Sequence, residues 1–308
     1  VDLKQFTLED YRVELAQGGE PALTLSGQGT FDSATQDADL QLALRATITR
    51  LLTLFPQPDA ALTGGSVELT GRVASKAQNQ TVTGRLALTG LSGKFSNFKF
   101  ASFGTTSDLD LGMKGSQLDI RKAAGELREG TNAGGQFDVS GNFDTARKAG
   151  KFALKLANFN QAGLRPFLES ALGDKTLVSV TLNSSATVAL EANGDASAKA
   201  DLQLANLVVS DPKGALPKTP LELKAQFDAA VAKQVAKIAQ CQLTLTPTDR
   251  AKNEVKLTGT VDFSKTNAIA GNLKLAADSL DVTRYYNLFA GGTKPAAQAT
   301  PPPSATTP

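Results

Sequence analysis

The sequence predicts an all-β protein: an elongated, mostly antiparallel sheet built from repeats, either a curled groove or a sandwich, with two short helices. Three observations predict this class. Apolar and polar residues alternate over many segments, and turns rich in Gly, Asn and Asp separate those segments. One strand–turn–strand pattern also recurs along the chain.

The alternation is clearest in residues 38–48, and it recurs at 67–73, 137–143, 221–227 and 255–263. In the first segment the apolar positions are Ala38, Leu40, Leu42, Leu44, Ala46 and Ile48. A period of two gives a strand one apolar face and one solvated face, which favours antiparallel pairing.

Two segments have helical spacing instead. Residues 164–172 carry apolar side chains at intervals of three and four, with Pro166 near the first turn and Gly173 just past the end. Residues 282–289 have a similar apolar face, stopped by Gly291 and Gly292. The Ala- and Lys-rich segment 228–240 is interpreted as a hairpin that turns near Lys233 and Gln234.

An internal repeat is the most informative pattern. An apolar residue, Ser or Thr, and Gly open a strand that ends in Asp, and a turn and a return strand follow, with the glycines at 27, 141 and 259. These glycines lie 114 and 118 residues apart (141 − 27 and 259 − 141), and the second and third copies lead into the predicted helices. A mid-strand glycine usually marks a bulge or bend. We therefore expect one repeat region, 1–292, with units of roughly 1–114, 115–173 and 174–292.

The final residues, 293–308, hold five of the thirteen prolines together with Ala and Thr. This composition has too little apolar surface to form a core, so the segment is predicted to be a disordered tail.

Composition argues against most catalytic chemistry. The chain has no His and a single Cys, so the commonest general base, the usual metal ligand, an intrachain disulfide and any CxxC site are excluded. Cys241 alternates with Ala239 and Leu243 and is interpreted as a buried strand residue. The net charge of +2 has no concentrated basic run, which argues against nucleic-acid binding. No enzyme activity, cofactor site or metal site is predicted.

Two weaker catalytic patterns were weighed and set aside. Ser210 and Lys213 have the Ser-x-x-Lys spacing, but Pro212 lies between them in a turn and the partner motifs are missing. Two carboxylate pairs, Asp37 with Asp39 and Asp108 with Asp110, each share one strand face; solvated strand faces carry such pairs routinely.

The repeat unit resembles those of the AsmA-like family of bacterial envelope proteins, best over residues 115–170 and 235–290. The resemblance implies a periplasmic β-sheet curled into a groove that shelters or transfers phospholipid, or another envelope lipid, during outer-membrane biogenesis. It also implies attachment to the inner membrane. No stretch of this chain approaches the ~18 apolar residues of a membrane helix, so any anchor is expected in a segment absent from this chain.

The expected groove lining comes from the apolar positions of the alternating strands. These candidates are Leu40, Leu42, Leu44, Val67, Leu69, Phe137, Val139, Phe143, Val178, Val180, Leu257 and Val261. The same alternation would also build the dry core of a sandwich. The alternative function is therefore an extracellular β-sandwich module that binds a protein or glycan partner.

Overall fold

The computed structural model describes residues 4–212, 214, 216, 218–265 and 268–289. Within these residues the chain forms fifteen strands and three helices, which confirms the all-β prediction. The predicted tail, 293–308, lies outside the described residues, as does Lys213.

The elements follow one another in a simple order. The strands are β1 (Gln5–Gln17), β2 (Glu20–Asp32), β3 (Asp37–Thr47), β4 (Ala60–Lys76), β5 (Asn79–Phe95), β6 (Phe98–Lys114), β7 (Gln117–Glu129), β8 (Asn132–Asp144), β9 (Ala149–Asn160), β10 (Thr176–Leu190), β11 (Ala196–Ser210), β12 (Leu221–Ala232), β13 (Val235–Leu245), β14 (Glu254–Asp262) and β15 (Ala270–Ala277). The helices are α1 (Ile48–Leu54), α2 (Gln161–Leu172) and α3 (Thr283–Phe289).

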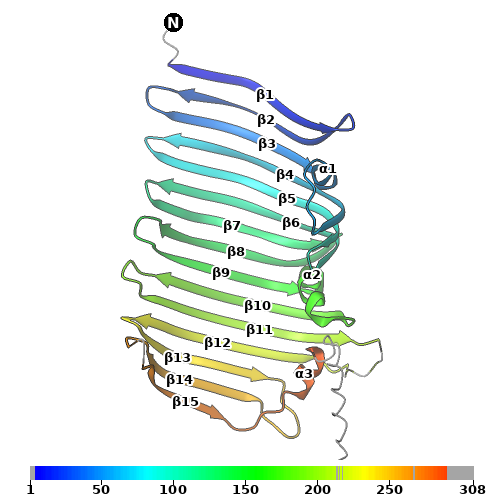
Figure 1. The fold of residues 1–308 in the computed structure, drawn as a ribbon, viewed down its shortest axis with the longest axis vertical. Coiled ribbons are helices and arrows are strands. Elements are labelled where there is room, and N and C mark those ends of the chain that lie inside the picture. Colours follow the sequence, from blue (N-terminus) through cyan, green and yellow to red (C-terminus); the bar gives the residue numbers. More distant parts are fainter. Residues whose placement is uncertain (1–3, 213, 215, 217, 266–267, 290–308) are drawn as a thin grey trace, which may run out of the picture.

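All fifteen strands of the described chain belong to one antiparallel sheet, in which each strand pairs with its neighbours in sequence (Figure 1). The sheet does not close into a barrel, so β1 and β15 are free edges. Of the two predicted forms, the groove is therefore the one observed. The Ala- and Lys-rich segment 228–240 is a hairpin as predicted, with Lys233 and Gln234 both at positive φ (50° and 64°) in its turn.

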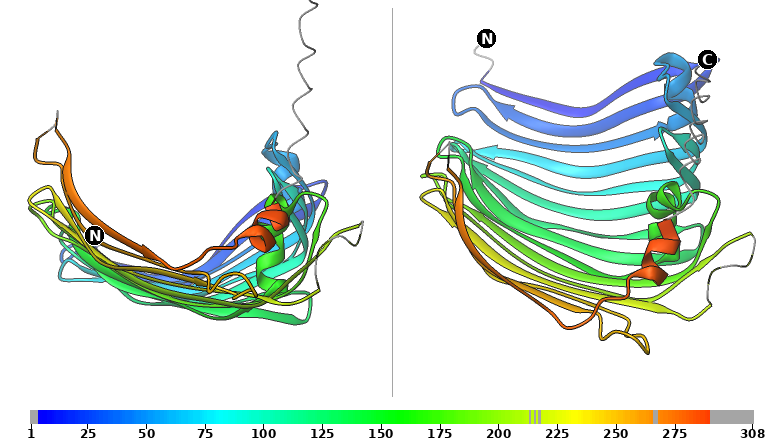
Figure 2. Two further views of the ribbon diagram at one scale, coloured as in Figure 1. Left: turned by 90° about the horizontal axis from the view of Figure 1, so that it is seen from below. Right: turned by 60° about the horizontal axis from the view of Figure 1, so that its bottom comes forward.

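The sheet is curled into a trough, and the three helices lie inside its concave side along one edge (Figure 2). This arrangement follows from a six-strand period. β3, β9 and β15 run in the same direction because six steps, an even number, lead from each to the next in the antiparallel order, and each is followed by a helix. We call the helix-bearing side the helix edge, and the opposite side, formed by the turns after β2, β4, β6, β8, β10, β12 and β14, the hairpin rim.

Helix α1 was not predicted from the sequence, where its first residue was taken as the end of a strand. Its apolar residues Ile48, Leu51 and Leu52 have helical spacing. However, the helix is only seven residues long, has no side-chain cap and carries no acidic residue in its first turn. The usual start signals were therefore missing. With α1, every copy of the repeat leads into a helix, including the first.

The repeat reappears in the strand register. The register shifts by one residue between Leu8 and Tyr11, between Ile120 and Ala123, and between Ile238 and Cys241. The residues facing these bulges are Gly29, Gly141 and Gly259, so the expected alignment of Gly27 with the later glycines is wrong by two residues. Gly141 and Gly259 have φ of 157° and 141°, and a Cβ there would lie 2.3 and 2.1 Å from a backbone oxygen of the next strand.

Each repeat also ends β2, β8 or β14 with the same turn. The carboxylates of Asp32, Asp144 and Asp262 accept the backbone N–H two residues ahead at 2.8, 3.0 and 2.8 Å. These hydrogen bonds favour the ionised form. The pKa of each carboxyl therefore lies below its ordinary value of 3.8. The largest cause is the backbone N–H of Thr35 at Asp32, the backbone N–H of Arg147 at Asp144 and the Ser264 side chain at Asp262.

In the described part of the chain, the buried hydrophobic cluster lies at the helix edge. Its buried residues are Leu172, Leu177, Val180, Val209, Leu221 and Leu288. Helix α2 approaches β8 closely because Gly163 meets Gly134; a Cβ on Gly163 would lie 2.2 Å from the Gly134 carbonyl oxygen. The ring of Phe167 on α2 packs edge-on against Phe103, with centroids 6.0 Å apart. The helices thus seal one side of the concave face.

Candidate functional site: an apolar trough

Side chains on the concave face line up in rows that cross the whole sheet. The register pairs most apolar residues with an apolar residue on the next strand, from β1 to β15, and the exceptions are Ser75, Gln80, Ser107 and Ser184. The row through Leu42 is Tyr11, Gly27, Leu42, Gly71, Gly84, Leu109, Ala123, Val139, Leu154, Ala186, Ala200, Phe227, Cys241, Leu257 and Leu275. Such a row is a continuous apolar strip perpendicular to the strands.

Three more rows run parallel to this one. The row through Leu44 lies nearer the helix edge, and those through Leu40 and Phe143 lie nearer the hairpin rim. The row through Leu40 contains only apolar residues and glycine. It consists of Leu8, Gly29, Leu40, Val73, Val82, Leu111, Ile120, Gly141, Phe152, Val188, Ala198, Ala229, Ile238, Gly259 and Leu273. We call the surface of these four rows the trough.

Most of the groove residues expected from the sequence lie on this face. Those in the four rows are Leu40, Leu42, Leu44, Leu69, Phe137, Val139, Phe143, Leu257 and Val261. Val67 lies one position closer to the helix edge, opposite Ala46 and Leu88. The alternation therefore placed these residues on a common face, although they come from strands far apart in sequence.

Two expected groove residues do not belong to the trough. Val180 is only 2% exposed, because it is part of the core at the helix edge. Val178 falls at the register shift between Leu177 and Ser179, and its side chain is 49% exposed. The irregular start of β10 breaks the period of two on which both assignments depended.

No segment among the described residues covers the centre of the trough. Leu154, Val188 and Phe227 are 37%, 38% and 40% exposed, although each has apolar neighbours in its row. Exposed apolar residues scattered singly are normal on a protein surface, whereas a contiguous patch marks an interaction site. The groove candidates expected from the sequence had omitted these residues, although the alternation at 152–156, 186–190 and 221–227 was available to identify them.

The outer face of the sheet has the opposite character. Cross-strand ion pairs join Arg72 to Asp39 and Lys122 to Asp108, the latter at 3.1 Å. Hydrogen bonding to Arg72 lowers the pKa of the Asp39 carboxyl below its ordinary value, as Arg121 does for Asp110. The paired carboxylates considered from the sequence thus serve mainly as ion-pair partners on a solvated face.

Cys241 lies on β13 as expected, but its side chain is only partly buried rather than enclosed. It belongs to the trough, between Phe227 and Leu257 in the row through Leu42. The single thiol of the chain is therefore a natural attachment point on the trough floor.

Comparison with known protein families, with characterised proteins and with solved structures finds no significant match to this chain. Among the described residues, no helix is long and apolar enough to cross a membrane. The functional argument therefore depends on the geometry of the trough.

Proposed function

We propose that this protein shelters or transfers lipid, with the acyl chains lying in the trough and no chemical reaction taking place. The observation that carries the proposal is that the two central rows, through Leu42 and Leu40, cross all fifteen strands without a charged or amide side chain, on a face that the described helices cover only along one edge. The flanking rows are apolar except at Ser107 and Ser184 in the row through Leu44 and at Ser75 and Gln80 in the row through Phe143. A surface of this kind is unfavourable in water, and a flexible hydrocarbon ligand would remove that cost.

The energy available is large enough for binding. Each methylene group moved from water to an apolar surface contributes ~0.8 kcal/mol, so a sixteen-carbon chain gains roughly 12 kcal/mol before entropy is subtracted. Fourteen steps between neighbouring strands, each of ~4.8 Å, give a trough about 67 Å long. This is about twice the ~30 Å hydrocarbon thickness of a bilayer.

The trough surface also suits hydrocarbon better than a rigid ligand. Its rows are mostly Leu, Val, Ala and Gly, with a few scattered Ser and Gln side chains, and it lacks the closed shape of an ordinary pocket. Gly71 and Gly84 face each other in the row through Leu42 and leave the floor without side chains there. Lipid tails differ in length and unsaturation, so a smooth aliphatic channel can accept many of them.

The resemblance of the repeats to the AsmA-like family supplies the setting of the proposal. It favours a periplasmic protein of outer-membrane biogenesis whose ligand is phospholipid or another envelope lipid. In this setting the protein would be held at the inner membrane by a segment outside this chain.

The native thiol allows a direct test. Cys241, labelled with a polarity-sensitive fluorophore, should shift its emission to shorter wavelength when palmitoyl lysophosphatidylcholine is added below its micelle concentration. The matched control moves the label to the outer face of the neighbouring strand, in a Cys241→Ser, Thr258→Cys variant, because Thr258 is exposed and adjacent to Leu257. Equal shifts from both labels would contradict binding in the trough.

A second pair of variants tests the floor itself. Val139→Asp places a charge in the row through Leu42, whereas Ser140→Asp places it on the other face of the same strand. Val139→Asp should weaken lysolipid binding at least about tenfold, because burying a charge against hydrocarbon is costly, and Ser140→Asp should leave binding unchanged. Circular dichroism checks that both variants are folded. Unchanged affinity in a folded Val139→Asp protein would refute the proposal.

A further inference from the structure

The hairpin rim carries a basic segment in its middle. Three consecutive hairpins, β4–β5, β6–β7 and β8–β9, contribute five cations at or next to their turns, and we call this set the basic rim. Its members are Lys76, Lys114, Arg147, Lys148 and Lys151. The turns on either side are acidic instead, with Asp32 and Asp37 before the segment and Glu191 and Asp195 after it. The positive charge is therefore localised, although the whole chain has a net charge of only +2.

Most of these cations are not engaged in ion pairs. Within the described residues, none of the four lysines has an ion pair or a side-chain hydrogen bond, whereas Arg72, Arg121 and Lys122 on the outer face are all paired. Arg147 lies 3.8 Å from Asp144, but its side chain is 77% exposed. The Asp144 carboxylate is already held by the backbone N–H groups of its turn and by the Ser116 hydroxyl.

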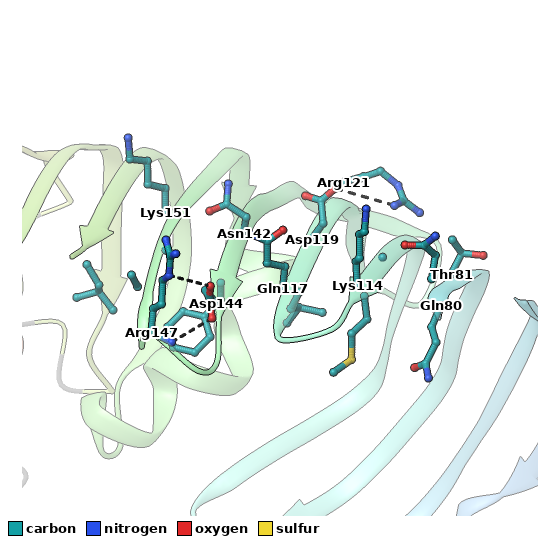
Figure 3. Close-up of a pocket in the computed structure, with 18 of the residues that line it drawn as sticks. Gln80, Thr81, Lys114, Gln117, Asp119, Arg121, Asn142, Asp144, Arg147 and Lys151 are labelled. Carbon is teal, nitrogen blue, oxygen red and sulfur yellow. Dashed lines mark hydrogen bonds and ion pairs between the residues drawn. The ribbon is translucent and has the colours of Figure 1, made fainter. Parts of the chain in front are cut away.

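Between these hairpins the structure has an open cavity of about 680 Å³ (Figure 3). Lys114, Arg147 and Lys151 contribute to its wall, and the backbones of Gly112 and Gly150 leave room in its floor. Arg121 lies over Gly112 and binds Asp110, with Asp119 at 3.9 Å. The wall also contains the carboxylates of Asp119, Asp144 and Glu191, of which the first two have the partners just described. Unpaired positive charge thus remains next to a concave surface.

On the trough side, the row through Phe143 is apolar just inside two of these hairpins, β6–β7 and β8–β9, whereas at the β4–β5 hairpin it consists of Ser75 and Gln80. Lys114 is followed inward by Met113, which pairs with Leu118, and Leu118 pairs with Phe143. Met113 is 42% exposed. Exposed cations beside an exposed apolar strip are typical of surfaces that lie at the interface of an anionic membrane.

We propose that the basic rim docks onto an anionic lipid surface, with its cations at the phosphate-bearing headgroups and the apolar row at the interface. Successive hairpins lie two strands apart, about 9.6 Å, so three of them present a linear array of charges along one side of the trough. This docking would place the hairpin rim, which runs along one long side of the trough, against the lipid layer. It does not depend on lipid entering the trough, because surface binding and trough occupancy are measured separately.

The test is flotation of the protein with vesicles. The intact chain should bind vesicles of phosphatidylglycerol mixed with phosphatidylcholine, should bind more weakly as salt is added, and should not bind pure phosphatidylcholine. The rim variant Lys114→Gln, Lys148→Gln, Lys151→Gln should bind about 100-fold more weakly, since each lysine near an anionic surface contributes roughly fivefold. A control with the same change of charge is Lys224→Gln, Lys237→Gln, Lys274→Gln, whose lysines are exposed on other strands. It should bind like the intact chain.

Several results would overturn the inference. Equal weakening by the two triple variants would mean that net charge alone governs binding, and strong binding to pure phosphatidylcholine would mean that apolar insertion does. Tighter binding to duplex DNA than to the vesicles, lost in the rim variant, would assign the surface to nucleic acid. The Val139→Asp variant should still float with the vesicles. Vesicle binding therefore tests the basic rim even if lipid does not bind in the trough.

Discussion

The helix edge and the open trough are made of the same strands with the same alternation, yet they differ in what covers them. Leu177, beneath the helices, is 1% exposed, whereas Leu154, in the trough, is 37% exposed. Both residues occupy apolar positions of β-strands, Leu177 in the irregular start of β10 and Leu154 in a regular part of β9. The comparison shows that coverage by α1, α2 and α3, rather than the pattern of the strands, decides which apolar residues form a dry core.

The helix edge and the trough therefore contribute differently to stability and to the proposed binding. Stability is concentrated where the helices pack, because only there are large side chains removed from water on every side. The trough is held mainly by backbone pairing with strands on both sides and leaves its side chains available to a ligand. Variants at the two places should therefore behave differently, and the following predictions test that expectation.

The largest effect is expected from truncating the covered core. Leu177→Ala should lower the free energy of unfolding by ~2–5 kcal/mol, because it leaves a cavity under the helices. Leu154→Ala removes the same atoms from the exposed trough and should cost less than ~1 kcal/mol. Urea unfolding followed by circular dichroism measures both. Equal losses at the two positions would show that the trough is covered in solution.

A smaller loss of stability is expected from removing the Asn253 hydrogen bonds, which hold the segment that leads into α3. Asn253 is fully buried; its Nδ2 donates to the Thr246 carbonyl at 2.7 Å, and its Oδ1 accepts from the Asp281 N–H at 2.6 Å. Asn253→Ala leaves both partners unsatisfied and should cost ~1–3 kcal/mol. Hydrogen exchange should become faster at the Asp281 amide.

The matched control for Asn253→Ala is Gln28→Ala on the outer face, where the Gln28 amide donates to Gln41 at 3.2 Å. Water can replace this exposed hydrogen bond, so the change should stay within ~0.5 kcal/mol. A larger loss at Gln28 than at Asn253 would reverse the stated difference between the faces.

The smallest effect should come from the hairpin rim as the pH falls. The pKa values of Asp32, Asp144 and Asp262 are lowered in the folded chain, so these turns contribute stability that is fully present above the ordinary pKa of 3.8. That contribution is lost as the pH falls through the lower folded-state pKa. The amide resonance of Ala146 should titrate with a midpoint below 3.8 and should not titrate in an Asp144→Asn variant. A midpoint above 3.8 would contradict the turn geometry.

Much of this fold could be predicted because its governing pattern is local. The period of two assigns side chains to faces without knowledge of distant contacts, which is why Leu42, Val139 and Leu257 were placed together correctly. The turn at Lys233 and Gln234 was likewise accessible from neighbouring residues. Features that depend on local sequence were therefore recovered from it.

The remaining features depend on tertiary structure or on irregular backbone. An open trough and a closed sandwich share one alternation, and only the absence of a covering sheet over the described residues distinguishes them. The burial of Val180 depends on a helix and on two later strands. Gly29, rather than Gly27, is the glycine that corresponds to Gly141 and Gly259. It is identified by the bulge in β1 that it faces, and this bulge cannot be recognised from the sequence of β2 alone.

The plain strand order has one more consequence, which concerns how the chain folds and comes apart. Every strand pairs only with its sequence neighbours, so each added hairpin closes a short loop and docks on a finished edge. Stability then approximates a sum over adjacent pairs, as in solenoid proteins. Unfolding should begin at the ends of the sheet and proceed inward, strand by strand. It should start at β15, because all eight residues of that strand are exposed. A groove assembled in this way can be lengthened or shortened by whole hairpins without redesign of its middle.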